Sequence, residues 1–168
     1  MPRRCIRCGT KFGRPFWRWR GGGEAGARGA SPDPASAGTP REWLHYTASD
    51  LRLAWLGRPD RDVLPNQIAF HAQQATEKAL KGVLLGHGVE FPKTQHLDEL
   101  IELVQEAGLA WPFPMDQVEA LTPYAVQTRY PGGVAQVSRA QVDEAIAIAE
   151  QVLAWAHQEV AKASGAGS

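Results

Sequence analysis

Apolar residues recur at helical spacing along most of the chain after residue 40. A stripe over about 65–85 predicts one helix face, formed by Ile68, Ala72, Ala75, Ala79, Leu80, Val83 and Leu84. Two further stripes predict helices over about 97–106 and 138–161. The residues expected to face inward in the first are Leu97, Leu100, Ile101 and Val104. Those expected to face inward in the second are Val142, Ile146, Ala149, Leu153 and Ala156. No segment of this region alternates with period two, so we expect helices and no sheet.

Caps and helix breakers indicate where these helices begin and end. Thr39-Pro40-Arg41-Glu42 matches a capping box and opens a first helix that ends near Gly57. Its candidate inward residues are Trp43, Tyr46, Leu51, Ala54 and Trp55. A fourth helix is expected over about 115–128, with a kink or break at Pro123, and Ser138-Arg139-Ala140-Gln141 is a second capping box. The pattern predicts an all-α fold, an up-down antiparallel bundle of about five helices.

Composition separates an N-terminal arm from this bundle. Residues 13–40 contain no Leu, Ile or Val, so they have little to bury, and we expect 1–39 to be disordered. Residues 1–40 hold eight basic and two acidic side chains, whereas the rest of the chain holds ten and sixteen. The net charge of zero therefore hides a basic arm on an acidic body. We expect the bundle to cover 40–162, followed by a flexible tail, 163–168.

Membrane, export and metal signals are weak. No apolar run approaches the ~18 residues of a membrane span, and no secretory h-region follows Arg3 and Arg4, so we expect a cytoplasmic protein.

Cys5 and Cys8 have the spacing of a zinc knuckle but supply only two of four ligands. Histidines of the body or a second chain could complete the site; a vestigial pair is the alternative. We expect no cofactor and zinc absent or substoichiometric.

Three groups of residues could carry function. Phe16-Trp17-Arg18-Trp19-Arg20 mixes bases and aromatics, which suits single-stranded nucleic acid or any anionic surface. The second helix carries Gln74, Glu77, Lys78 and Lys81, which read either as a solvated face or as a nucleotide contact. Arg129 follows the fourth helix, where its guanidinium could cap that helix or bind phosphate.

Three motifs resemble the HEPN domain family, the higher-eukaryote and prokaryote nucleotide-binding domains. Residues 70–81, Phe-His-Ala-Gln-Gln-Ala-Thr-Glu-Lys-Ala-Leu-Lys, resemble the family's second-helix signature. Residues 91–100 look like the stretch that follows it, and Arg129-Tyr130-Pro131 like the family's Arg-Tyr-Pro element. The resemblance covers about 41–160. It implies a helical bundle, usually a homodimer, whose gene often neighbours that of a minimal nucleotidyltransferase in a two-gene toxin–antitoxin system.

Many members of this family are metal-independent RNases with a histidine four to six residues after the arginine. Here the chain reads Tyr-Pro-Gly-Gly-Val-Ala-Gln after Arg129, without a histidine. We therefore expect a non-catalytic component that binds a nucleotide or RNA, and not an enzyme. The alternative is a divergent RNase toxin that uses His96 or another base. The binding residues that the resemblance implies are Arg129, Tyr130, Lys78, Lys81, Gln74, Glu77 and His96.

Overall fold

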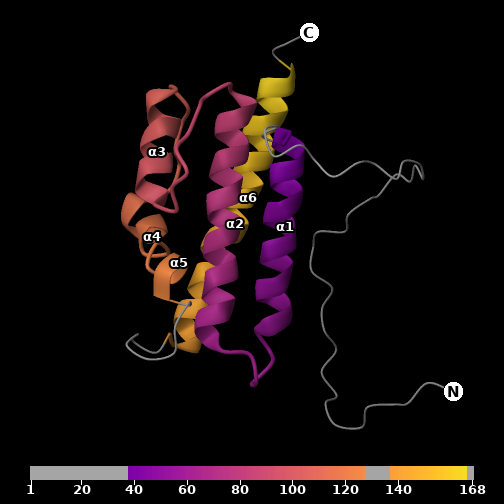
Figure 1. Cartoon of the computed structure of the whole chain (residues 1–168), viewed down its shortest axis with the longest axis vertical. Helices are drawn as coiled ribbons and strands as arrows, with labels where there is room; N and C mark the ends of the chain where they lie inside the picture. Colours follow the sequence, from indigo (N-terminus) through magenta and orange to yellow (C-terminus); the bar gives the residue numbers. More distant parts are fainter. Residues whose placement is uncertain (1–37, 128–136, 166–168) are drawn as a thin grey trace, which may run out of the picture. The chain divides into compact units, whose positions relative to one another are not determined.

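The computed structural model describes residues 38–127 and 137–165, and this part of the chain is helical with no strand (Figure 1). The helices are α1 (Pro40–Gly57), α2 (Pro65–Gly86), α3 (Leu97–Glu106), α4 (Met115–Glu119), α5 (Tyr124–Gln127) and α6 (Arg139–Gly165). The predicted all-α fold is confirmed. The expected fourth helix is two short ones, and Pro123 stands immediately before the second, as its missing N–H leads one to expect.

Helix α2 is the centre of the bundle and packs against α1, α6, α3 and α5. In Figure 1 its ribbon lies between α3 and α1, with α6 alongside. All seven residues of its predicted apolar stripe are buried, as are the four predicted for α3. Gly82 lets α1 approach closely, because a Cβ there would lie 3.1 Å from Trp43 Cβ. The core is therefore built on α2, and any polar side chain on its buried faces must find a partner inside the protein.

Helix α1 contradicts one part of the predicted inward set. Tyr46 does not face the core, since 63% of its surface is exposed. The buried stripe is instead set by Leu44, Thr47, Leu51 and Ala54. On an ideal helix Tyr46 lies about 140° around the axis from Leu51 and about 120° from the centre of that stripe. The aromatic side chain suggested burial, but the helical phase opposes it.

Local chemistry accounts for the helix ends. The Thr39 side chain accepts from Glu42 N while the Glu42 carboxylate accepts from Thr39 N, so the first capping box is confirmed. Ser138 and Gln141 make the same reciprocal pair before α6. Beyond α2, Gly88 adopts a positive φ of 71° that few other residues tolerate.

Two of the predictions concern the ends of the chain. Helix α6 continues to Gly165, four residues past the predicted end, so 163–165 are helical rather than part of a tail. Residues 1–37, with Cys5, Cys8 and the aromatic-arginine segment 16–20, lie outside the described residues. Within the described ranges, no helix has the length and apolar character needed to cross a bilayer.

Candidate functional site

Helix α2 carries polar side chains into the interior of the bundle. Gln73 and Thr76 are fully buried, and Glu77 and Lys81 are nearly so. Thr76 is satisfied locally, because its hydroxyl donates to the carbonyl of Ala72 one turn earlier. The other three join a network that extends beyond the helix. This side of α2 is therefore not a solvated face.

The pair Glu77–Lys81 lies at the centre of this network. Lys81 Nζ donates to Glu77 Oε1 at 2.7 Å, as the i,i+4 spacing predicts, and to the carbonyl of Thr94 at 2.8 Å. Its ammonium also lies 5.9 Å from the centre of the Phe91 ring, within range of a cation–π contact. Lys81 thus ties the segment between α2 and α3 onto α2.

Two glutamine amides complete the surroundings of the Glu77 carboxylate. Gln73 Nε2 and Gln74 Nε2 both donate to Glu77 Oε2 at 3.2 Å, and Gln74 Nε2 also donates to Gln73 Oε1 at 2.8 Å. Both oxygens of the carboxylate are therefore hydrogen-bonded. A buried carboxylate is tolerated when it is paired and fully bonded in this way.

A second group of charges joins α1 to α2 at the edge of the network. Lys78 Nζ donates to Asp50 Oδ2, and His71 Nδ1 lies 3.1 Å from Asp50 Oδ1. Burial raises the pKa of Asp50, but the hydrogen bonds from His71 and Lys78 outweigh it and bring the pKa below its ordinary value. Lys78 also lies 3.4 Å from Gln74 Oε1, which connects this group to Glu77.

The segment before α3 closes the other end of the network. Thr94 gives its carbonyl to Lys81, and its hydroxyl accepts from the backbone N–H of His96 at 3.0 Å. The His96 imidazole is largely exposed, and its Nδ1 is 4.0 Å from Asp98 Oδ1. A continuous chain of polar contacts thus runs from Asp50 on α1 across α2 to the N-cap of α3.

The structure brings together five of the seven residues that the resemblance implied. Gln74, Glu77, Lys78 and Lys81 are linked directly, and His96 joins them through Thr94. Arg129 and Tyr130 lie outside the described residues. Lys78 and Lys81 do not present one shared positive surface, because Lys78 reaches α1 whereas Lys81 reaches Thr94.

Sequence reasoning missed four members of this network: Asp50, His71, Gln73 and Thr94. Asp50 lies 21 residues before His71 and 28 before Lys78, so no local spacing connects them. Thr94 acts through its backbone carbonyl, which has no signature of its own. Gln73 was visible only as one more polar residue on a helix with an apolar stripe. Among the described residues, no group of three or more His, Cys, Asp or Glu could hold a metal ion.

Comparison with known proteins places the chain in a family. A family model described as HEPN domain matches residues 61–160, well over half of the chain. No curated protein matches. The structure resembles that of ST0689, an archaeal HEPN homologue, with a TM-score of 0.55 and 21% identity over 73% of this chain and 98% of that one. It also resembles TT1696 from Thermus thermophilus, with a TM-score of 0.56 and 30% identity over 71% of this chain and 97% of that one. From the extent of the family match, the chain belongs to the HEPN domain family.

Proposed function

We propose that this HEPN-domain protein binds a nucleotide or RNA without cleaving it. In this proposal it acts as a cytoplasmic homodimer, paired with a minimal nucleotidyltransferase in a two-gene toxin–antitoxin-type system. The family match supports the HEPN assignment. The pairing, the homodimer and the ligand rest on the resemblance of Arg129-Tyr130-Pro131 and the α2 signature to the nucleotidyltransferase-associated members.

The observation that carries the non-catalytic assignment is the sequence after Arg129. RNA cleavage of the family type needs an arginine to stabilise the phosphate and a histidine to move a proton at the ribose 2′-OH. The seven residues after Arg129 contain no histidine and no other side chain that titrates near neutral pH. The chain therefore has the arginine of this motif without a histidine that could transfer the proton.

The polar network supports the proposal because it fixes the positions of the α2 side chains that we assign to the ligand. Arg129, with its planar fork, is the residue we assign to a phosphate, and Tyr130 is assigned to the same ligand. Lys78 is partly exposed and Gln74 lies beside it, so both can contact a ligand at the α2 surface. Glu77 and Lys81 are buried and bonded to each other, so their part is to hold Gln74 and the segment leading to His96 in position.

The proposal is tested by fluorescence anisotropy with labelled ATP and a labelled single-stranded RNA oligonucleotide. A charge-assisted contact to phosphate is worth about 1.5–3 kcal/mol, so Arg129→Ala should weaken affinity by roughly ten- to a hundredfold. Arg129→Lys should restore little, because lysine cannot make the bidentate contact. Arg41→Ala removes a positive charge from the exposed start of α1 and serves as the matched control.

The same samples decide against the alternative of a divergent RNase. The oligonucleotide should stay intact with wild type and with Arg129→Ala. Cleavage by wild type that disappears in Arg129→Ala would overturn the non-catalytic assignment. Unchanged binding in that variant would return Arg129 to the role of a helix C-terminal cap. Co-elution with a nucleotidyltransferase encoded by the neighbouring gene tests the partner.

A further inference from the structure

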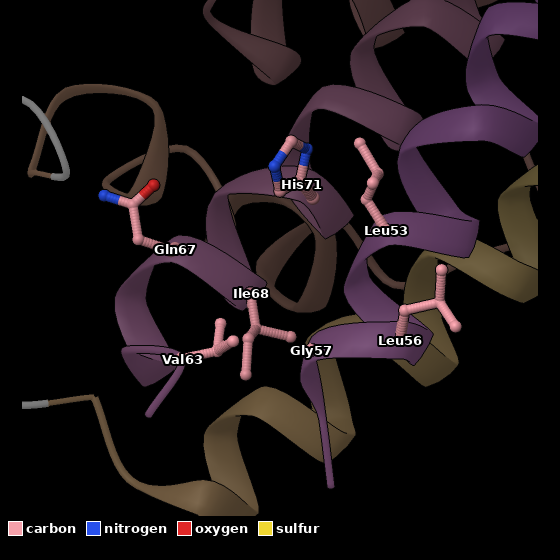
Figure 2. Close-up of a pocket in the computed structure, with 7 residues that line it drawn as sticks. All are labelled: Leu53, Leu56, Gly57, Val63, Gln67, Ile68 and His71. Atoms are coloured by element: carbon pink, nitrogen blue, oxygen red, sulfur yellow. The ribbon is translucent and has the colours of Figure 1, made fainter. Parts of the chain in front are cut away.

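An open hollow of about 320 Å³ lies between the end of α1 and the start of α2. Figure 2 shows the side chains that line it, which come from both helices and from the loop between them. Its apolar walls are formed by Leu53, Leu56, Val63 and Ile68. Gly57 leaves room beside them, because a Cβ there would lie 3.1 Å from Val63 and 3.2 Å from Ile68. The volume lies at the lower end of the range for small-molecule sites, so the hollow suits one ring system rather than a whole nucleotide.

His71 is a polar side chain in this lining, and α1 fixes the orientation of its ring. Its Nδ1 lies 3.1 Å from Asp50 Oδ1, and the other oxygen of that carboxylate accepts from Lys78. A carboxylate can only accept, so the neutral ring carries its proton on Nδ1. Nε2 is then a hydrogen-bond acceptor. Because 31% of the His71 side chain is exposed, a ligand in the hollow can reach it.

These features select a ligand with flat apolar faces and an N–H donor at one edge. The faces contact the leucine, valine and isoleucine walls, and the donor pairs with His71 Nε2. A polar group that enters an apolar site without a partner weakens binding. Adenine has an exocyclic amine and no carbonyl, and its ring nitrogens can face water on the open side. The other bases each carry a carbonyl oxygen, which the Nε2 acceptor cannot pair.

We infer that this hollow holds the adenine base of the bound nucleotide or RNA, with its exocyclic amine donating to His71 Nε2. The inference rests on the proposed function and names the base that the protein takes. Asp50 is a positioning residue here, because it acts on the ligand only through His71. Arg129 is assigned to a phosphate, so a ligand without phosphate tests the hollow by itself.

The test is an NMR titration of the full-length protein with adenosine, which has no phosphate. Purine riboside lacks only the exocyclic amine and should bind roughly three- to tenfold more weakly than adenosine, through the loss of one hydrogen bond. Leu53→Asn replaces an apolar wall by an amide and should weaken adenosine binding roughly tenfold. Leu64→Asn is the matched control, since Leu64 does not line the hollow. The two leucines are 47% and 61% exposed, so both variants should keep the circular dichroism of the wild type.

Replacing His71 separates recognition of the amine from a structural role. His71→Phe keeps a ring but removes the acceptor, so adenosine should fall to the affinity of purine riboside, and purine riboside should change little. A purely structural role would weaken both nucleosides alike. In long-range proton–nitrogen spectra of the wild type, His71 Nε2 should be the nitrogen without a proton and should shift when adenosine is added. His45→Phe, at an exposed position of α1, is the control.

Two pairs of ligands distinguish the sources of the base. If it belongs to a free nucleotide, ATP should bind more tightly than UTP. If it belongs to RNA, an oligoadenylate should bind more tightly than an oligouridylate. Leu53→Asn should remove the preference in either case.

The outcomes separate this inference from the proposed function. Adenosine that does not bind, or that binds Leu53→Asn and His71→Phe as it binds wild type, would overturn the hollow as the base site. ATP or RNA binding that still depends on Arg129 would then leave the proposed function standing. Absence of adenosine, ATP and RNA binding would overturn both.

Discussion

Replacing Lys81 by methionine tests whether the buried pair on α2 is structural. The substitution keeps the aliphatic length but removes both donated hydrogen bonds, to Glu77 Oε1 at 2.7 Å and to the Thr94 carbonyl at 2.8 Å. Both partners are buried, so neither can replace the lost contact with water. Breaking a buried pair by removing one partner costs about 3–5 kcal/mol. Gln73 and Gln74 still donate to the stranded carboxylate, which favours the lower end, about 3 kcal/mol.

The assay is urea and thermal unfolding followed by circular dichroism. A loss of about 3 kcal/mol should lower the melting temperature by roughly 10 °C for a domain of this size. The double variant Glu77→Leu/Lys81→Met should cost less than the sum of the two single changes, because a carboxylate and an ammonium then disappear together. Asp143→Asn removes the exposed pair between Arg58 and Asp143, and this control should cost less than about 1 kcal/mol.

Two results would refute this reasoning about Lys81. A melting temperature within about 2 °C of wild type would mean that the ammonium is not held as the structure shows. Additive effects of Glu77→Leu and Lys81→Met would mean that the two side chains do not interact. A loss of nucleotide affinity in Lys81→Met without a loss of stability would make Lys81 a binding residue instead.

Two further predictions concern α1. Asp50→Asn should lower stability by about 1–2 kcal/mol at pH 7, since His71 and Lys78 then lose a charged acceptor. Because the pKa of Asp50 is lowered on folding, its contribution is present above about pH 4 and is lost as pH falls further, so wild type and variant should converge in urea midpoints measured toward about pH 3. Removing residues 1–37 should leave the melting temperature nearly unchanged, since 13–37 lack Leu, Ile and Val. Removing 1–39 should cost about 0.5–2 kcal/mol more, because it deletes the Thr39 cap; equal melting temperatures for the two truncations would contradict that role.

Local sequence determined the helices and most of the core. The apolar period alone identified the buried faces of α2 and α3, because a helix that packs on one side needs apolar residues at a fixed phase. The two capping boxes marked the starts of α1 and α6, since each is complete within four residues. The three motifs at 70–81, 91–100 and 129–131 together identified the family that the comparison confirms.

Only the tertiary structure decided which polar residues meet. Glu77 and Lys81 are spaced as an i,i+4 pair, which on a solvated helix face is worth only about a few tenths of a kcal/mol, but the segment around Thr94 buries this pair. Asp50 reaches His71 and Lys78 because α1 and α2 lie side by side, a contact that no local period encodes. Tyr46 is the opposite case, a residue expected in the core that the structure leaves exposed. Its aromatic ring suggested the core, yet the burial of a side chain depends on which neighbour covers its side of the helix, and this is a property of the assembled fold.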